Sequence, residues 1–183
     1  MALEHERRFL VNGCALPTYE WWKVKHRTGP GGALEEERTH IEQVYLAQSD
    51  GTSVRVRKSR FLFAGNPIKY ELTVKGPGTV TRAEHTLLLQ EAVARPLMEG
   101  KHALRKIRTI YQGPDGIRLE VDEFEDGLRG LILMEVEADL EVLGGYDPPL
   151  FCEREVTEDP RYTNAALWAL GPALEHFRRD WLR

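Results

Sequence analysis

The chain has 183 residues, of which 42% are hydrophobic and 30% charged, and its formal net charge at pH 7 is −4. These values predict a soluble globular protein with a single domain over 1–183, and the acidic balance argues against a nucleic-acid polymer as partner. No apolar run reaches the roughly 18 residues of a membrane span, so we expect no membrane partner. The two cysteines lie far apart without metal-ligand spacing, which favours a cytoplasmic location.

The first expected strand, LEHERRFLV at 3–11, places charges at strict two-residue spacing. Successive side chains of a strand point to opposite faces, so Glu4, Glu6 and Arg8 share one face. Such a face is ordinarily the solvated side of a half-buried antiparallel strand. The rest of the chain decides between that interpretation and a functional one.

The segment after this strand is expected to leave the sheet. Pro17 precedes apolar and basic residues at helical spacing, which predicts a short helix over 17–27. TGPGGALEEE at 28–37 combines turn-forming residues with an acidic run and lacks the G-K-[ST] ending of a phosphate-binding P-loop. We therefore expect a loop over 28–37.

Strand-length segments then follow one another, separated by SDG, AGN and GPG turns. EAVARPLMEG predicts a short helix over 91–100 that is interrupted or ends near Pro96, and GPDG predicts a tight turn at 113–116. The end of the chain returns to helical spacing, which predicts one or two helices over 159–170 and 172–182. The pattern indicates an α+β fold with about eight antiparallel strands. The later strands are expected at 38–47, 52–61, 67–76, 80–90, 102–112, 117–125 and 131–139.

Charged side chains recur on one face of nearly every expected strand, more densely than on an ordinary solvated surface. Carboxylates concentrate on the first strand and the last two, and cations on the strands between. This suits a polyanion bound with a divalent metal, since Mg²⁺ and Mn²⁺ take carboxylate and phosphate oxygens while Arg and Lys donate to the remaining phosphoryl oxygens. A closed antiparallel barrel with a water-filled, charged lumen would provide such a binding site. A solvated outer face of the sheet remains the alternative interpretation of the charges.

An ordered series of short motifs resembles the CYTH superfamily, also called triphosphate tunnel metalloenzymes. EHERR at 4–8 matches that family's E-x-E-x-K signature, with Arg8 in place of Lys. Each motif is weak alone, but the ordered set covers nearly the whole chain and is specific. The resemblance implies an eight-stranded antiparallel β-barrel, or tunnel, with peripheral helices. The other motifs are VRVR at 54–57, LTVKG at 72–76, R-x-E at 82–84, K-x-R at 106–108, LEVDEF at 119–124, MEVEAD at 134–139 and EVTEDPRYTNAAL at 155–167.

The resemblance also implies roles for the charged residues, with Mg²⁺ or Mn²⁺ and a triphosphate-bearing small molecule in the tunnel. Phosphoryl transfer depends mainly on positioning and charge stabilisation, so no nucleophilic side chain is required. Tyr162 and Asn164 of the last motif are expected to have structural roles. The implied metal ligands are Glu4, Glu6 and Glu137, with Glu135 as a close competitor; the implied triphosphate contacts are Arg8, Arg55, Arg57, Lys75, Arg82, Lys106 and Arg108; Glu84, Glu120 and Asp122 are expected to hold a second metal or position the attacking water.

Two positions depart from the family pattern. Arg8 can bind phosphate but cannot accept a proton as a Lys of lowered pKa can, and Thr86 stands where relatives often carry another Glu. The leading expectation is metal-dependent hydrolysis of inorganic tripolyphosphate or a related triphosphate, because ERRFLV resembles the short bacterial triphosphatases. A class IV adenylyl cyclase, a thiamine triphosphatase and a triphosphate-binding protein without turnover remain open. A monomer and a homodimer both remain open.

Overall fold

A computed structural model of the chain describes residues 2–12, 36–62, 65, 68–112 and 116–171. The expected helices over 17–27 and 172–182 lie outside the described residues, as do most of the expected loop and of the GPDG turn. The last two residues of that loop, Glu36 and Glu37, belong to a strand. Within the described part, no helix is long and apolar enough to cross a membrane.

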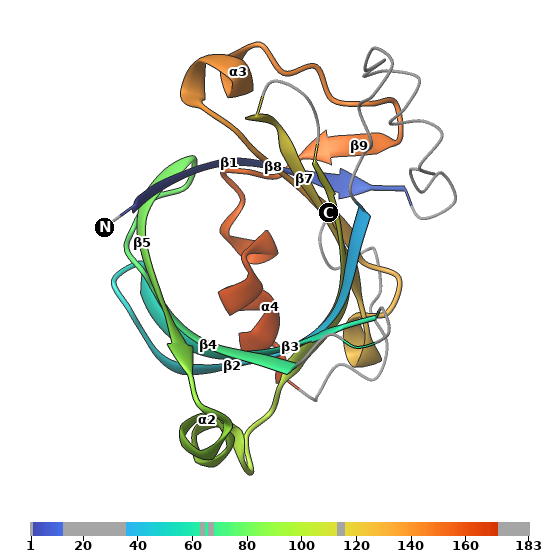
Figure 1. Cartoon of the computed structure of the whole chain (residues 1–183). Helices are drawn as coiled ribbons and strands as arrows, with labels where there is room; N and C mark the ends of the chain where they lie inside the picture. Colours follow the sequence, from blue (N-terminus) through green and yellow to red (C-terminus); the bar gives the residue numbers. More distant parts are fainter. Residues whose placement is uncertain (1, 13–35, 63–64, 66–67, 113–115, 172–183) are drawn as a thin grey trace.

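Eight antiparallel strands close into a barrel (Figure 1), which confirms the fold class expected from the sequence. Around the barrel the order is β5-β4-β3-β2-β6-β7-β8-β1, and β1 closes the ring by pairing its residues Ala2 to His5 with Glu84 to Thr81 of β5. A ninth strand, β9 (Cys152–Glu155), pairs with the end of β1. The barrel strands are β1 (Ala2–Val11), β2 (Glu36–Ser49), β3 (Thr52–Phe61), β4 (Ile68–Lys75), β5 (Thr81–Leu89), β6 (Leu104–Gln112), β7 (Arg118–Phe124) and β8 (Ile132–Glu137).

Three α-helices accompany the barrel in the described residues. Helix α2 (Glu91–Met98) contains Pro96 and ends two residues later, so its end lies near Pro96 as expected. Helix α3 (Leu140–Gly144) and β9 were not expected, since each is too short to produce a readable periodicity. Helix α4 (Asn164–Ala169) covers only part of the helix expected over 159–170. Short 3-10 helices span Asp126–Leu128 and Pro160–Tyr162.

The apolar core lies mostly outside the barrel wall rather than within the lumen. Phe9, Met134 and Phe151 belong to a buried cluster between the outer face of β1, β6, β7 and β8 and the segment that contains α3. A second cluster, around Val56 and Tyr70, lies beneath α2. Because these side chains occupy the outward positions of their strands, the alternate positions, which carry the charges, face inward.

Helix α4 lies across one end of the barrel (Figure 1). Its Leu167 is buried in a cluster with Leu104 and Leu133 at the starts of β6 and β8. Trp168, which packs against the same cluster, also packs against Tyr45 of β2 with ring centroids 5.4 Å apart. The helix begins at a side-chain cap, because the Thr163 hydroxyl accepts a hydrogen bond from the backbone N–H of Ala166. The start of α4, with Thr163, Asn164 and Ala165, lines the cavity in the barrel.

Candidate active site in the barrel lumen

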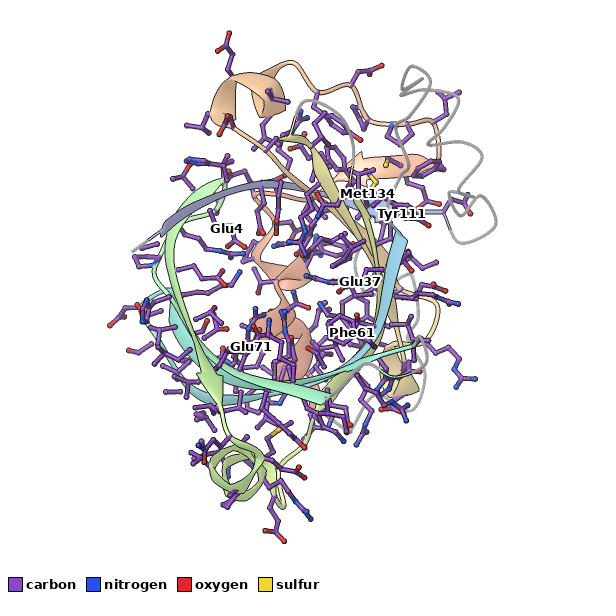
Figure 2. All side chains as sticks on the ribbon, in the orientation of Figure 1. Glu4, Glu37, Phe61, Glu71, Tyr111 and Met134 are labelled. Carbon is purple, nitrogen blue, oxygen red and sulfur yellow. The ribbon has the colours of Figure 1, made fainter. Side chains whose placement is uncertain are left out.

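A cavity of about 390 Å³ occupies the lumen and is lined by side chains of all eight barrel strands and the start of α4. In Figure 2, Glu4 and Glu71 lie inside the ring of strands, whereas Met134 lies on its outer side. The charged face that the alternation predicted is therefore the inner face of the barrel. The solvated-surface interpretation is wrong for these strands.

Three carboxylates meet at one place in the lumen. One oxygen each of Glu4, Glu6 and Glu137 lies within 4.8 Å of the others. Strand β1 contributes Glu4 and Glu6 from alternate positions, and Glu137 of β8 lies opposite Glu6 in the ladder. Arg82 bridges two members of this carboxylate cluster, donating to Glu4 at 2.9 Å and to Glu6 at 2.6 Å. The cluster therefore already stabilises positive charge.

The cluster's two β1 carboxylates titrate differently because their neighbours differ. Burial alone would raise the pKa of Glu4, but Lys75 and Arg82 lower it to about 2. Burial and the nearby Glu135 raise the pKa of Glu6 to about 7, against the opposing effect of Arg8 and Arg82. A divalent cation with oxygen ligands fits the donor set of the cluster and would favour the charged form of Glu6.

Glu135 lies apart from the cluster, although the sequence left it as a close alternative to Glu137 as a metal ligand. Its carboxylate accepts hydrogen bonds from Arg8 at 2.9 Å and from Arg108 at 2.8 Å. Burial would raise the pKa of Glu135, but Arg8 and Arg108 hold it well below its ordinary value. Glu137, and not Glu135, brings a carboxylate oxygen within 4.8 Å of those of Glu4 and Glu6, so the geometry favours Glu137 as the third ligand.

Arg108 is the centre of a buried ion-pair network on β6, β7 and β8. It donates to Asp122 at 2.6 Å through Nε and through Nη2, contacts Glu135 at 2.8 Å, and pairs with Glu120. Lys106 donates to the same Asp122 at 2.5 Å and to Asn164 at 2.9 Å. Lys106 and Asp122 are 0% and 1% exposed, and like the buried Glu6 they are not among the cavity-lining residues.

The other two expected water-positioning residues do line the cavity. Glu84 pairs with Lys75 at 2.6 Å and accepts a hydrogen bond from Thr86 at 3.1 Å. Glu120 pairs with Arg108 and also with Arg118 at 2.6 Å. Thr86, which stands where relatives often carry another Glu, thus donates a hydrogen bond to Glu84.

Arg55 and Arg57 differ from the other lumen cations because no ion pair or hydrogen bond joins them to any residue that the structure describes. Arg55 is only 5% exposed, and the Nε atoms of both are buried without an acceptor. Burial, Arg55 and Arg108 lower the pKa of Arg57 to about 9. Buried cations without partners are costly, so this arginine pair is poised to bind an anion.

Replacing Arg57 with Met is expected to raise the free energy of unfolding of the ligand-free protein by about 1 kcal/mol, because a half-buried charge whose Nε has no acceptor among the described residues is removed. Urea denaturation in a buffer free of phosphate and sulfate measures the change. Arg60→Met is the matched control, since Arg60 lies on the same strand but is exposed and is not among the cavity-lining residues. A loss of stability in Arg57→Met would show that Arg57 has a partner that stabilises the fold.

Several cavity-lining residues were missed in the sequence. Glu37, Thr39, Ile41 and Tyr45 of β2 face the lumen at the same two-residue spacing, but their mixed polarity hid the signal. Asn164 was assigned a structural role, and it lines the cavity. No strand alternation could have placed a helix residue there.

No protein-family model matches the chain, but individual relatives do. An inorganic triphosphatase of Nitrosomonas europaea is 30% identical over 168 residues, which cover 90% of this chain and 95% of the relative. An inorganic triphosphatase of Acetivibrio thermocellus is 32% identical over 171 residues, which cover 91% and 94%. The crystal structure of the inorganic triphosphatase NE1496 matches with a TM-score of 0.54 and 30% identity, covering 91% of this chain and 95% of that one.

Proposed function

The chain belongs to the CYTH superfamily, which includes short bacterial triphosphatases, and on this premise we propose that it is a divalent-metal-dependent triphosphatase. The proposed substrate is inorganic tripolyphosphate, or a related small triphosphate. One observation carries the proposal: Glu4 and Glu137 of the carboxylate cluster line the same cavity as Arg55 and Arg57, which have no partner among the described residues, and the buried Glu6 completes the cluster. A site that offers ligands to a cation and free donors to an anion suits a metal-bound polyphosphate.

The carboxylate cluster would hold Mg²⁺ or Mn²⁺, both of which prefer carboxylate oxygens. When bound, the metal supplies charge stabilisation at the phosphoryl oxygens. Arg55 and Arg57 bind phosphoryl oxygens through their free N–H groups, and such charge-assisted bonds strengthen where water is excluded.

The remaining lumen residues orient the reactants. Lys75 and Arg82 line the cavity beside Glu4 and can donate to the phosphate chain. Glu84 and Glu120 would orient the attacking water from the cavity wall, and Asp122 would support Glu120 by holding Arg108 in position. Water attacks the terminal phosphorus and pyrophosphate leaves, so tripolyphosphate and one water give orthophosphate and pyrophosphate.

Product analysis with the purified full chain tests this function. Tripolyphosphate with Mg²⁺ or Mn²⁺ is expected to release orthophosphate, and a chelator in excess of the metal is expected to abolish the release. ATP offered separately is expected to give no cyclic AMP. Cyclic AMP with pyrophosphate would instead identify an adenylyl cyclase, and metal-dependent binding without product would identify a binding protein.

A further inference from the structure

Asn164 brings a neutral side-chain donor to the cavity from outside the strands. It is the first residue of α4 and lines the cavity between Thr163 and Ala165. The Thr163 hydroxyl is already used, because it accepts from the N–H of Ala166 and donates to the carbonyl of Pro160. Asn164 is therefore the residue of this turn whose side chain can serve a ligand.

The orientation of the Asn164 amide follows from its partner. Its Oδ1 accepts a hydrogen bond from the Lys106 ammonium at 2.9 Å, and an ammonium group only donates. Lys106 is itself held by Asp122 at 2.5 Å and is 0% exposed, so this contact cannot shift freely. With the oxygen turned to Lys106, the Asn164 NH₂ group has no acceptor among the described residues.

Arg55 lies toward the same end of the lumen. Tyr45, which packs on Trp168 of α4, is paired with Arg55 across the β2–β3 ladder, and both side chains line the cavity. Residues opposite each other in an antiparallel pair have neighbouring side chains. The end of the cavity beneath α4, here called the inner end, therefore combines an unpartnered cation with an unpartnered amide donor.

We infer that the Asn164 amide donates a hydrogen bond to the phosphoryl group at the inner end of a bound triphosphate, beside Arg55. Lys106 is the positioning residue that turns this amide. The inference rests on the proposed function and gives α4 a part in substrate binding as well as in the fold. It also gives a role to the placement of Lys106, which is 0% exposed and is not among the cavity-lining residues.

Asn164→Asp separates binding from folding. Asp is favourable in the first turn of a helix and would face the Lys106 ammonium, so the thermal midpoint should stay unchanged or rise. The same change replaces a donor to phosphate with an anion, and KM for tripolyphosphate should rise by about tenfold or more. Ala169→Asp is the matched control, because it adds the same charge to the exposed end of α4, at a residue that is not among those lining the cavity.

Asn164→Ala removes the donor without adding charge, and we expect KM to rise by about tenfold with a smaller change in kcat. If Lys106 acts through the amide, Lys106→Met combined with Asn164→Ala should match the KM of Asn164→Ala alone. A folded Asn164→Ala protein with wild-type KM would overturn the inference, even if Asn164→Asp is impaired. Additive effects on KM would overturn the role of Lys106. Absence of tripolyphosphate hydrolysis in the unaltered protein would instead be a failure of the proposed function, and the dissociation constant for tripolyphosphate would then replace KM.

Discussion

Glu4→Gln is expected to lower kcat/KM for tripolyphosphate by about a thousandfold or more, which corresponds to about 4 kcal/mol of transition-state stabilisation. Gln keeps the shape of the side chain and removes the charge that would hold Mg²⁺ or Mn²⁺ with Glu6 and Glu137. Glu4 is a suitable position because it pairs with Lys75 and Arg82 at the cavity wall rather than inside the Arg108 network. Steady-state kinetics over a range of Mn²⁺ concentrations measures the effect.

Glu37→Gln is the control for this variant. Glu37 also lines the cavity, from β2, but it is not a member of the carboxylate cluster. Its replacement should change kcat/KM by no more than about tenfold, because it removes charge without removing a metal ligand. Equal losses in the two variants would mean that the overall charge of the lumen, and not the cluster, supports activity. Full activity in Glu4→Gln would show that the carboxylate cluster is not needed for catalysis.

The second large effect concerns stability. Arg108→Met should lower the free energy of unfolding at pH 7 by about 3–5 kcal/mol, because Glu120, Asp122 and Glu135 lose a shared buried partner. Urea denaturation measures the loss. The control, Arg105→Met, removes an arginine from the same strand that is 42% exposed and pairs with Asp126, and it should cost no more than about 1 kcal/mol.

The loss in free energy of unfolding caused by Arg108→Met should also depend on pH. In the unaltered protein, burial would raise the pKa of Asp122 and of Glu135, but arginine neighbours lower both. A carboxylate with a lowered pKa in the folded state contributes stability above its unfolded pKa and loses it as the pH falls. The difference between variant and unaltered protein should therefore be largest near neutrality and shrink below about pH 4. A deficit that is the same at pH 7 and at pH 4 would contradict the ion-pair account.

The barrel could be predicted from the sequence because its strands carry an unusually strong alternation. Charges at every second position of β1, β3 and β6 specify one face of each strand, and the register of an antiparallel sheet follows from that face. The alternation alone could not tell which face was inside; the family resemblance implied that the charged face lines a tunnel, and the packing of the apolar positions against α2 and α3 outside the wall shows it. In most sheets the charged face is the solvated one.

Which charges pair with which could not be read from the sequence, because pairing depends on the stagger between strands. Arg55 and Arg108 have the same spacing pattern on their strands, yet Arg108 meets three carboxylates and Arg55 meets none in the described part of the chain. For the same reason, the sequence could not decide between Glu135 and Glu137 as a metal ligand. Asn164 was missed for another reason, since a helix that enters the lumen has no counterpart in the strand pattern.

Crystallography of the protein with Mn²⁺ and tripolyphosphate, in the Glu84→Gln variant to slow turnover, tests the central claim most directly. Anomalous scattering is expected to place Mn²⁺ among Glu4, Glu6 and Glu137, with phosphoryl oxygens within hydrogen-bond distance of Arg55 and Arg57. Mn²⁺ bound elsewhere, or tripolyphosphate bound outside the barrel while the lumen contains only water, would contradict the account.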